Sequence, residues 1–280
     1  MVDIEAAIGF VVARGDRVDR ARLSWLRNGT APHPGLLDAV EAGQTSDGGW
    51  PAILDDAVPS VDATCFRLGE LDDLGAIGRS AGRKAMDWLA ARQRADGTWE
   101  EDSALADVAP EWARPGDPEA QLYLTANAAY WIAVAGLGAR SSGPLDDRVG
   151  GAYAGVVQGA AQALAAAIEP DGSWPSYLAT GWLSAAVLHG QGMYLESARI
   201  QGVLGDRLPE MAAADAAWLA ATFSRVSMAP GNRVLQAALD RLGETQRSDG
   251  GWDSADGEQF DVHTTLAAIR ACLPARTPAG

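Results

Sequence analysis

The chain has 280 residues, of which 48% are hydrophobic and 21% charged, and this is enough for the core of one large globular domain. Its formal net charge of −15 and its single lysine, Lys84, argue against nucleic acid and anionic membranes as partners. No apolar stretch is long enough to span a membrane, and the N-terminal Met1–Glu5 carries acids where a signal peptide carries basic residues. We therefore expect a cytoplasmic protein.

A short motif recurs along the chain and divides it into similar units. Its copies are Gln44–Trp50, Gln93–Trp99, Glu169–Trp174 and Gln246–Trp252, and all contain an Asp-Gly pair followed by a tryptophan. Asp-Gly favours a left-handed turn, the glutamine can cap the last carbonyl groups of the preceding helix, and the tryptophan can fold back over that helix end. Each copy is interpreted as a tight turn between two helices.

Two weaker turns, Arg14–Arg17 and Gly205–Pro209, bring the number of turns to six. One helix is predicted before each turn and one after it. In chain order the predicted helices span residues 2–13, 17–28, 34–44, 59–74, 79–93, 118–137, 149–168, 176–190, 192–204, 209–226, 231–245 and 258–273. This alternation predicts an all-α protein, a closed (α/α)6 toroid in which the second helix of each pair lines a central cavity.

The spacing of these turns predicts a single domain over residues 1–273, followed by a disordered tail over 274–280. The connection over residues 100–118 is longer than the others. Insertions of this size are often functional, so we treat it as a candidate lid over one mouth of the ring.

The Gln-x-x-Asp-Gly-x-Trp turns resemble the QW repeats of squalene–hopene cyclases and of protein prenyltransferase β subunits, over nearly the whole chain. The resemblance implies a toroid that binds an isoprenoid or a similar apolar chain in its central cavity. Squalene cyclases contain two such rings with the active site between them, whereas this chain has room for one. It therefore resembles a stand-alone ring, and a partner protein or a second domain in trans is an alternative source of the missing part.

The catalytic acid of class II terpene cyclases lies in an Asp-x-Asp-Asp-Thr stretch at the start of a helix. The matching residues here are Ser60-Val61-Asp62-Ala63-Thr64, so the resemblance implies Asp62 as the proton donor, without its two flanking acids. Asp55 and Asp56 on the preceding loop are candidates to replace them. The alternative is that Asp62 or Ser60 caps the helix, whose N-terminus lowers the pKa of a nearby carboxyl group.

Protein prenyltransferases bind zinc through an Asp-x-Cys pair and a histidine in a later Asp-x-x-His-Thr stretch. Asp261-Val262-His263-Thr264 resembles the later stretch but is one residue short, and the predicted helix 176–190 contains no Asp-x-Cys pair. Three ligands do not assemble, so we expect no metal and no other cofactor. His263 is then a candidate proton carrier or a polar residue at a helix start.

The pairs Asp72-Asp73 and Asp146-Asp147 lack a third acid at the spacing of a magnesium site. We interpret both pairs as solvated surface charge.

Aromatic residues on the predicted inner helices supply candidates for substrate binding, because aromatic faces stabilise carbocations and bind apolar chains. The candidates are Phe66, Tyr123, Trp131, Tyr177 and Trp182, with Asp261 at the mouth of the ring. The alternative is that part of this set packs against the outer helices.

The resemblance implies acid-initiated, class II cyclisation of an isoprenoid. Two alternatives stay open: a non-catalytic module that binds an apolar ligand or a partner subunit, and a carbohydrate-active toroid of the glycosidase or lyase type. The turn motif favours cyclisation, and the loss of the flanking acids favours the non-catalytic module.

Overall fold

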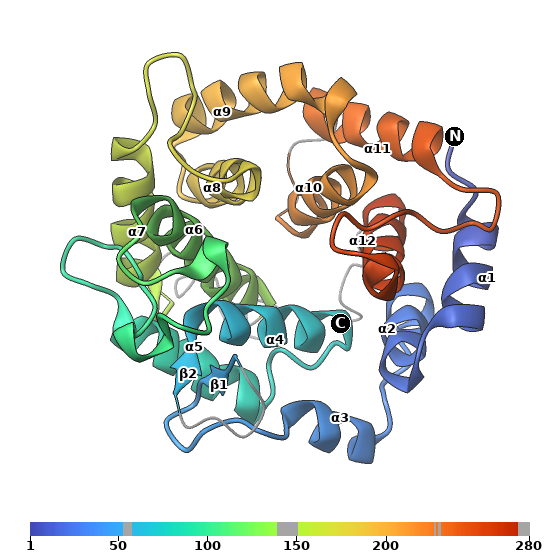
Figure 1. Cartoon of the computed structure of the whole chain (residues 1–280), viewed down its shortest axis with the longest axis horizontal. Helices are drawn as coiled ribbons and strands as arrows, with labels where there is room; N and C mark the ends of the chain where they lie inside the picture. The colour runs from blue at the N-terminus through green and yellow to red at the C-terminus, as the bar shows by residue number, and fades with distance from the viewer. Residues whose placement is uncertain (53–57, 139–150, 227, 229–230, 274–280) are drawn as a thin grey trace.

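The computed structural model describes residues 1–52, 58–138, 151–226, 228 and 231–273, which form a closed ring of helical hairpins (Figure 1). The outer helices are α1 (Ile4–Arg14), α3 (Pro34–Glu41), α5 (Ser80–Arg92), α7 (Ala154–Ala166), α9 (Tyr194–Arg207) and α11 (Arg233–Thr245). The inner helices are α2 (Arg17–Asn28), α4 (Val61–Asp73), α6 (Pro118–Gly138), α8 (Leu178–Gly190), α10 (Ala213–Arg225) and α12 (Asp261–Cys272).

The inner helices form a closed ring of their own. Each contacts the next one along the chain from α2 to α12, and α12 in turn contacts α2. Small side chains allow this close approach: Ala216, Ala217, Ala220 and Ala221 of α10 are all fully buried. The predicted single-domain, all-α (α/α)6 toroid is confirmed, and the helix bounds lie close to those predicted.

The glutamines of the repeated turns bind the next outer helix. Gln93 Nε2 donates to the carbonyl of Gly97 within its own turn (3.0 Å) and to that of Val156 in α7 (2.8 Å). Gln44 makes the same pair of bonds to its turn and to α5. Gln246 closes the ring, because its side chain both donates to and accepts from the backbone of Asp3, the N-cap of α1. The prediction that these glutamines cap the preceding helix is wrong.

Two of the four turn tryptophans bond to the preceding helix, as predicted, whereas Trp174 Nε1 donates to the carbonyl of Tyr177 after its turn. Trp99 Nε1 donates to the carbonyl of Leu89 in α5 at 2.8 Å, and Trp252 Nε1 donates to that of Leu242 in α11 at 2.9 Å. Both indole rings are fully buried. The turns Gln93–Trp99 and Gln246–Trp252 are therefore attached to the outer helix before them by the tryptophan and to the outer helix after them by the glutamine.

The glycine of the Asp-Gly pair is required by close backbone contact as well as by its conformation. Gly250 has a φ of 90°, and a Cβ at this position would lie 2.2 Å from the carbonyl oxygen of Ala6 in α1. An alanine here would be strained in the turn and would push α1 away.

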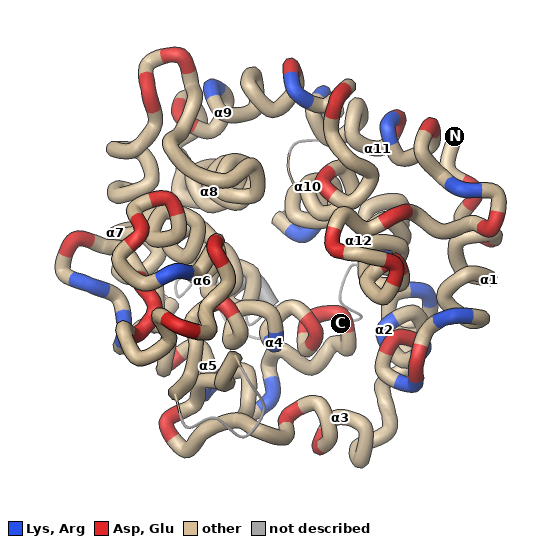
Figure 2. The backbone as a smooth tube through the Cα atoms, viewed as in Figure 1, with Lys and Arg blue, Asp and Glu red and all other residues tan. Residues whose placement is uncertain are grey.

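The remaining elements are short and lie in the connections. Strands β1 (Trp50–Pro51) and β2 (Pro59–Ser60) pair antiparallel just before α4. The 3-10 turns are η1 (Ser103–Leu105), η2 (Glu111–Ala113), η5 (Leu208–Glu210) and η6 (Glu258–Phe260). Figure 2 shows many of the acidic residues on the connections between helices. The whole chain has 37 acidic residues and 22 lysines and arginines. Within the described residues, no helix has both the length and the apolar character needed to cross a membrane.

Candidate active site

The start of α4 is capped by a residue other than Asp62. Ser60 Oγ accepts a hydrogen bond from the backbone nitrogen of Ala63 at 3.0 Å, which makes Ser60 the N-cap. Asp62 therefore keeps its carboxylate free of the cap, and the capping alternative applies to Ser60 alone.

The carboxylate of Asp62 receives hydrogen bonds from two other segments. Its Oδ1 accepts from the Tyr123 hydroxyl (3.2 Å) and from Asn127 Nδ2 (3.4 Å), and its Oδ2 accepts from Trp112 Nε1 (3.0 Å). Tyr123 and Asn127 lie one turn apart on α6, and Asn127 also donates to the Tyr123 hydroxyl at 3.2 Å. Trp112 belongs to η2, so the 100–118 connection contacts Asp62 through this residue.

Burial sets the acidity of Asp62. It raises the pKa of this carboxyl group above its usual value, and the hydrogen bonds from Trp112, Tyr123 and Asn127 oppose the rise without cancelling it. The position at a helix N-terminus predicts a lowered pKa for Asp62. The structure shows the opposite direction, because burial outweighs the other effects. Burial also raises the pKa of Tyr123 far above its usual value, which keeps the phenol neutral. A raised pKa favours the protonated form, which is the form that a general acid requires.

Glu101 is a second buried carboxylate at this end of α4. Its Oε1 accepts from Ser60 Oγ (2.7 Å) and from the backbone nitrogen of Asp62 (2.9 Å), and its Oε2 accepts from the backbone nitrogen of Val61 (2.8 Å). Its side chain therefore binds the free N–H groups at the helix start, where a negative charge is favourable. Burial raises the pKa of Glu101, and these three bonds oppose that rise.

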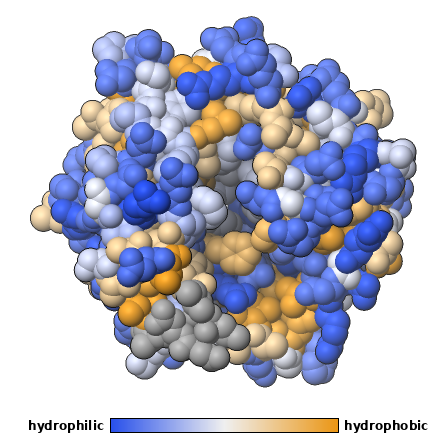
Figure 3. Space-filling view, in the orientation of Figure 1, coloured by the Kyte–Doolittle hydropathy of each residue, from blue (hydrophilic) through white to orange (hydrophobic). Residues whose placement is uncertain are grey.

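Two of the predicted aromatic residues lie beside Asp62. The ring of Tyr177 meets that of Tyr123 edge to face, with centroids 6.2 Å apart, and its hydroxyl donates to the carbonyl of Glu111 at 3.1 Å. Phe66 lies one turn after Asp62 on α4 and is 52% exposed although it belongs to an inner helix. Such exposure requires open space inside the ring, and Figure 3 shows this face hollowed at its centre.

The other two predicted aromatic residues are buried. Trp131 lies on α6 against Gly69 of α4 and stacks under the guanidinium of Arg225, whose Cζ is 5.2 Å from its ring centroid. Trp182 is 5% exposed and belongs to the core around α8. These two tryptophans are buried in the core, and the contacts of Trp131 are with the inner helices α4 and α10.

His263 belongs to a different group of residues from Asp62. Its Nδ1 lies 2.8 Å from Arg22 Nη1, and because arginine only donates, Nδ1 accepts and the ring proton is on Nε2. Burial and the charge of Arg22 lower the pKa of His263, so it is neutral at pH 7. The Phe66 ring lies 6.4 Å away, so His263 of α12 lies close to α4.

Asp261 does not join Asp62. Asp261 accepts from Arg247 Nη1 (2.6 Å) and from the backbone nitrogen of Ser254 (2.8 Å), so both of its oxygens hold the last turn together. Asp55 and Asp56 lie outside the described residues.

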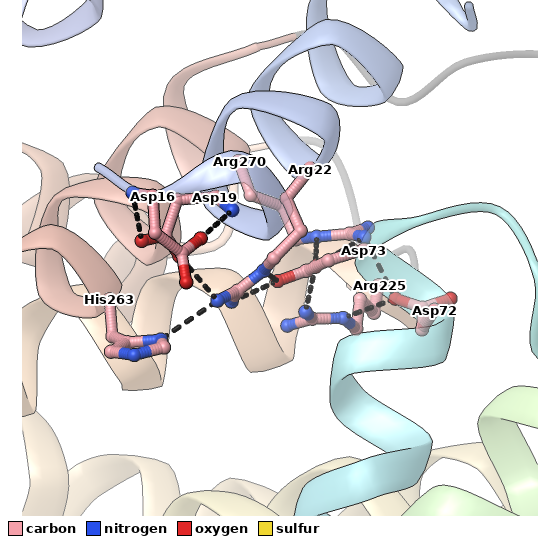
Figure 4. A network of polar contacts seen from close by, with 8 residues as sticks. All are labelled: Asp16, Asp19, Arg22, Asp72, Asp73, Arg225, His263 and Arg270. Atoms are coloured by element: carbon pink, nitrogen blue, oxygen red, sulfur yellow. Dashed lines mark hydrogen bonds and ion pairs between the residues drawn. The ribbon is translucent and has the colours of Figure 1, made fainter. Parts of the chain in front are cut away.

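Asp72 and Asp73, at the far end of α4, lie in a network of buried charges (Figure 4). Asp73 is 4% exposed and pairs with Arg22 (2.6 Å), Arg225 (2.8 Å) and Arg270 (2.6 Å). Asp72 pairs with Arg225 and Arg270, both at 2.8 Å. The interpretation of this pair as solvated surface charge is wrong, because the arginines come from three other inner helices. Asp146-Asp147 lies outside the described residues.

A cavity of about 260 Å³ lies between α2, α3, α4 and α12. The ionisable side chains that line it are Asp16, Asp19, Arg67, Glu70 and His263. These groups already have partners: Asp16 and Asp19 form the capping box of α2, and Glu70 pairs with Arg67 at 2.5 Å. Over the part of the chain that the structure describes, no cluster of His, Cys, Asp and Glu is arranged to hold a metal ion.

Three residues of the Asp62 group were missed in the sequence. Asn127 could have been found, because it lies one helical turn after Tyr123 on a predicted inner helix. Trp112 and Glu101 carry no local signal, since both lie on the long connection and meet α4 only in the folded ring.

No protein family model and no curated protein sequence matches the chain. Solved structures match its fold over almost its whole length. A protein from Actinoplanes matches with a TM-score of 0.61 at 18% identity, over 96% of this chain and 97% of that one. The type II terpene cyclase MstE from Scytonema in its apo form matches with a TM-score of 0.59 at 14% identity, over 96% and 95%. A variant of MstE in complex with merosterolic acid A, its product, also gives a TM-score of 0.59, at 15% identity over 96% and 94%. At these identities the similarity establishes a shared fold.

Proposed function

We propose that this protein binds an isoprenoid or a similar apolar chain inside its ring and cyclises it by protonation from Asp62. The observation that carries the proposal is a partly buried carboxyl group with a raised pKa that has three uncharged donors around it and no ion pair within the described residues. Burial has this effect on a carboxyl group because it disfavours the charged form.

The surroundings of Asp62 suit a carbocation. Tyr123 and Tyr177 lie next to it, and Phe66 is exposed one turn along the same helix. Aromatic faces attract cations without acting as bases, so they stabilise positive charge that develops along a chain. The similarity of the ring to MstE, whose structure has been solved with geranylgeranyl dihydroxybenzoate as its substrate, supports an isoprenoid ligand.

The proposed reaction is an isomerisation without redox change. Asp62 gives its proton to one carbon of a terminal C=C bond, and the other carbon becomes a cation. The π electrons of an internal C=C bond then form the new C–C bond of the ring and leave a cation further along the chain. This last cation loses a proton to restore a C=C bond, and the Asp62 carboxylate is protonated again from solvent.

The experiment is incubation of the purified protein with squalene, prenyl alcohols, prenyl diphosphates and a geranylgeranyl-substituted aromatic acid. Products are analysed by gas or liquid chromatography with mass spectrometry. We expect a cyclic product of unchanged mass that is absent with Asp62→Asn. The matched control is Asp215→Asn, because Asp215 also lies in the first turn of an inner helix, is partly buried and has a pKa raised by burial.

A product that persists in Asp62→Asn would exclude Asp62 as the acid. The absence of any product would favour the second candidate function, a non-catalytic ring that binds an apolar ligand. The observation in its favour is that Ser60 and Ala63 stand where the flanking acids of the cyclase motif are expected. Quenching of tryptophan fluorescence by the same compounds, without turnover, would then support it. The carbohydrate-active alternative has no observation in its favour, because Glu101, the carboxylate next to Asp62, is engaged by α4.

A further inference from the structure

The start of α4 regains, from another segment, a carboxylate that its own sequence lacks. The two acids expected on either side of Asp62 are replaced by Ser60 and Ala63. Glu101 comes from the 100–118 connection and binds the hydroxyl of Ser60 at 2.7 Å, which is the side chain at the first of these two positions. The lost charge is therefore restored at nearly the same place by a residue 41 positions away from Ser60.

Without this carboxylate, the helix would work against an acid at position 62. The unpaired N–H groups at a helix start carry a partial positive charge that favours the ionised form of a nearby carboxyl group. Glu101 accepts the N–H groups of Val61 and Asp62 at 2.8 and 2.9 Å, and it brings a negative charge of its own. The positive potential that the helix start would exert on the Asp62 carboxyl group is thereby replaced by a negative one.

We propose that Glu101 is the positioning residue that keeps Asp62 in its protonated form, a carboxylate supplied by the connection in place of the acids absent at positions 60 and 63. The inference rests on the proposed function of Asp62 as the proton donor. It also gives the 100–118 connection a second contact with the site, because the same segment supplies Trp112 to Asp62 Oδ2.

The hydrogen bonds decide which of the two carboxyl groups holds the proton. Burial raises the pKa of both groups, and the charge of Asp62 raises that of Glu101 further, so the two carboxyl groups compete for one proton. Glu101 accepts three bonds of 2.7 to 2.9 Å, two of them from backbone N–H groups of a helix start. Asp62 accepts three longer bonds of 3.0 to 3.4 Å from side chains. The negative charge is therefore better stabilised on Glu101, and the proton resides on Asp62.

The other titratable groups that face Asp62 are neutral. They are Tyr123 on α6 and Cys65 on α4, and burial raises the pKa of each far above its usual value. Glu101 accepts the backbone N–H of Asp62, so the two carboxyl groups are expected to titrate as a coupled pair.

The test is a carboxyl titration followed by ¹³C NMR on protein labelled at the side-chain carboxyl carbons of Asp and Glu. The signal of Asp62 is identified by its loss in Asp62→Asn. In the wild type we expect Asp62 to titrate above about pH 3.9, the ordinary value for aspartate. In Glu101→Gln we expect its midpoint to fall by about one pH unit, the effect of removing one close negative charge.

Glu100→Gln is the matched control. Glu100 is the preceding residue and carries the same charge, but it contacts Arg94 and accepts from the backbone nitrogen of Gly116 at 2.6 Å, away from α4. We expect the Asp62 midpoint to stay within about 0.2 pH units in this variant, since no close charge is removed. A second variant, Ser60→Asp combined with Glu101→Gln, restores an acid at position 60 and should return the midpoint toward the wild-type value.

An unchanged or higher Asp62 midpoint in Glu101→Gln would overturn the inference, as would a wild-type titration in which Glu101 holds the proton to higher pH than Asp62. If Glu101→Gln does not fold, a midpoint in the double variant that stays well below the wild-type value would overturn it too. The outcome is separate from that of the cyclase proposal. Cyclic product without the midpoint shift contradicts the role of Glu101 alone, and the shift without any product contradicts cyclisation alone.

Discussion

The two ends of α4 carry pairs of acids in opposite environments. At its N-terminal end, Asp62 and Glu101 have hydrogen-bond donors but, within the described residues, no cationic partner. At its C-terminal end, Asp72 and Asp73 are surrounded by arginines from three other inner helices (Figure 4). Burial raises the pKa at the first end, whereas at the second end the three arginines outweigh burial and hold the pKa of Asp73 far below its usual range.

This contrast distinguishes aspartates whose ion pairs stabilise the fold from an aspartate that is a candidate for chemistry. The Asp73 network ties α2, α4, α10 and α12 together, and each of its carboxylates is paired with arginines. Asp62 connects α4 to α6 through neutral donors, and its proton remains available. Since perturbed carboxyl groups without a counter-charge are typical of active sites, the N-terminal end of α4 is where chemistry is expected.

The comparison makes its largest prediction for Asp62→Asn. Removing the acid should lower the rate of product formation by roughly 10²- to 10⁴-fold, the usual contribution of a general acid.

The same variant, Asp62→Asn, should unfold at higher urea concentration than the wild type at pH 7. A carboxyl group whose folded pKa is raised reduces stability above that pKa, and the reduction disappears below its unfolded pKa of about 3.9. A loss of stability at pH 7 would contradict this assignment.

At the other end, Asp73→Asn should lower the free energy of unfolding by about 3–5 kcal/mol, because it leaves buried arginines without their shared partner. Urea unfolding followed by circular dichroism measures the change. Asp38→Asn is the control, because Asp38 is 72% exposed and lies 3.8 Å from Arg79. This exposed pair should contribute less than about 1 kcal/mol. Similar effects of the two substitutions would show that the buried network does not hold the ring together.

The difference between wild type and Asp73→Asn should depend on pH. A carboxyl group whose folded pKa is lowered contributes stability that is complete above its unfolded pKa and is lost as the pH falls toward its folded pKa. The difference in free energy of unfolding should therefore be constant between pH 7 and about pH 5 and should narrow below about pH 4. Urea titrations at several pH values measure this difference. A difference in free energy of unfolding that grows as the pH falls would contradict the prediction.

The smallest predicted effect concerns Trp112→Phe. This change keeps an aromatic ring on the connection but removes the 3.0 Å hydrogen bond to Asp62 Oδ2. That bond stabilises the carboxylate, so its loss should move the fall in activity with rising pH toward higher pH. The size of the change corresponds to one hydrogen bond, about 0.5–1.5 kcal/mol. Product formation measured from pH 4 to pH 9 tests it, and a shift toward lower pH would contradict the direction.

The architecture could be predicted because its signals are local. The Asp-Gly-x-Trp turns and the helical periodicity between them depend on residues a few positions apart, and their alternation was sufficient to predict the closed ring. The same local information failed for the turn glutamines, whose partners lie in the next outer helix. It also failed for Asp72-Asp73, since the pairing of Asp73 with Arg270 joins residues 197 positions apart.

The candidate site was found only in part, for the same reason. The sequence motif pointed to Asp62 and the helical pattern to Tyr123 and Tyr177, and these residues do lie together. Whether a carboxyl group is an acid depends on its burial and on the charges around it, and these are set by side chains that arrive from other helices and connections. Glu101 and Trp112 at one end of α4, and the arginines at the other, come from segments that meet α4 only when the ring closes. The tertiary structure alone therefore decided which aspartate has a raised pKa and which a lowered one.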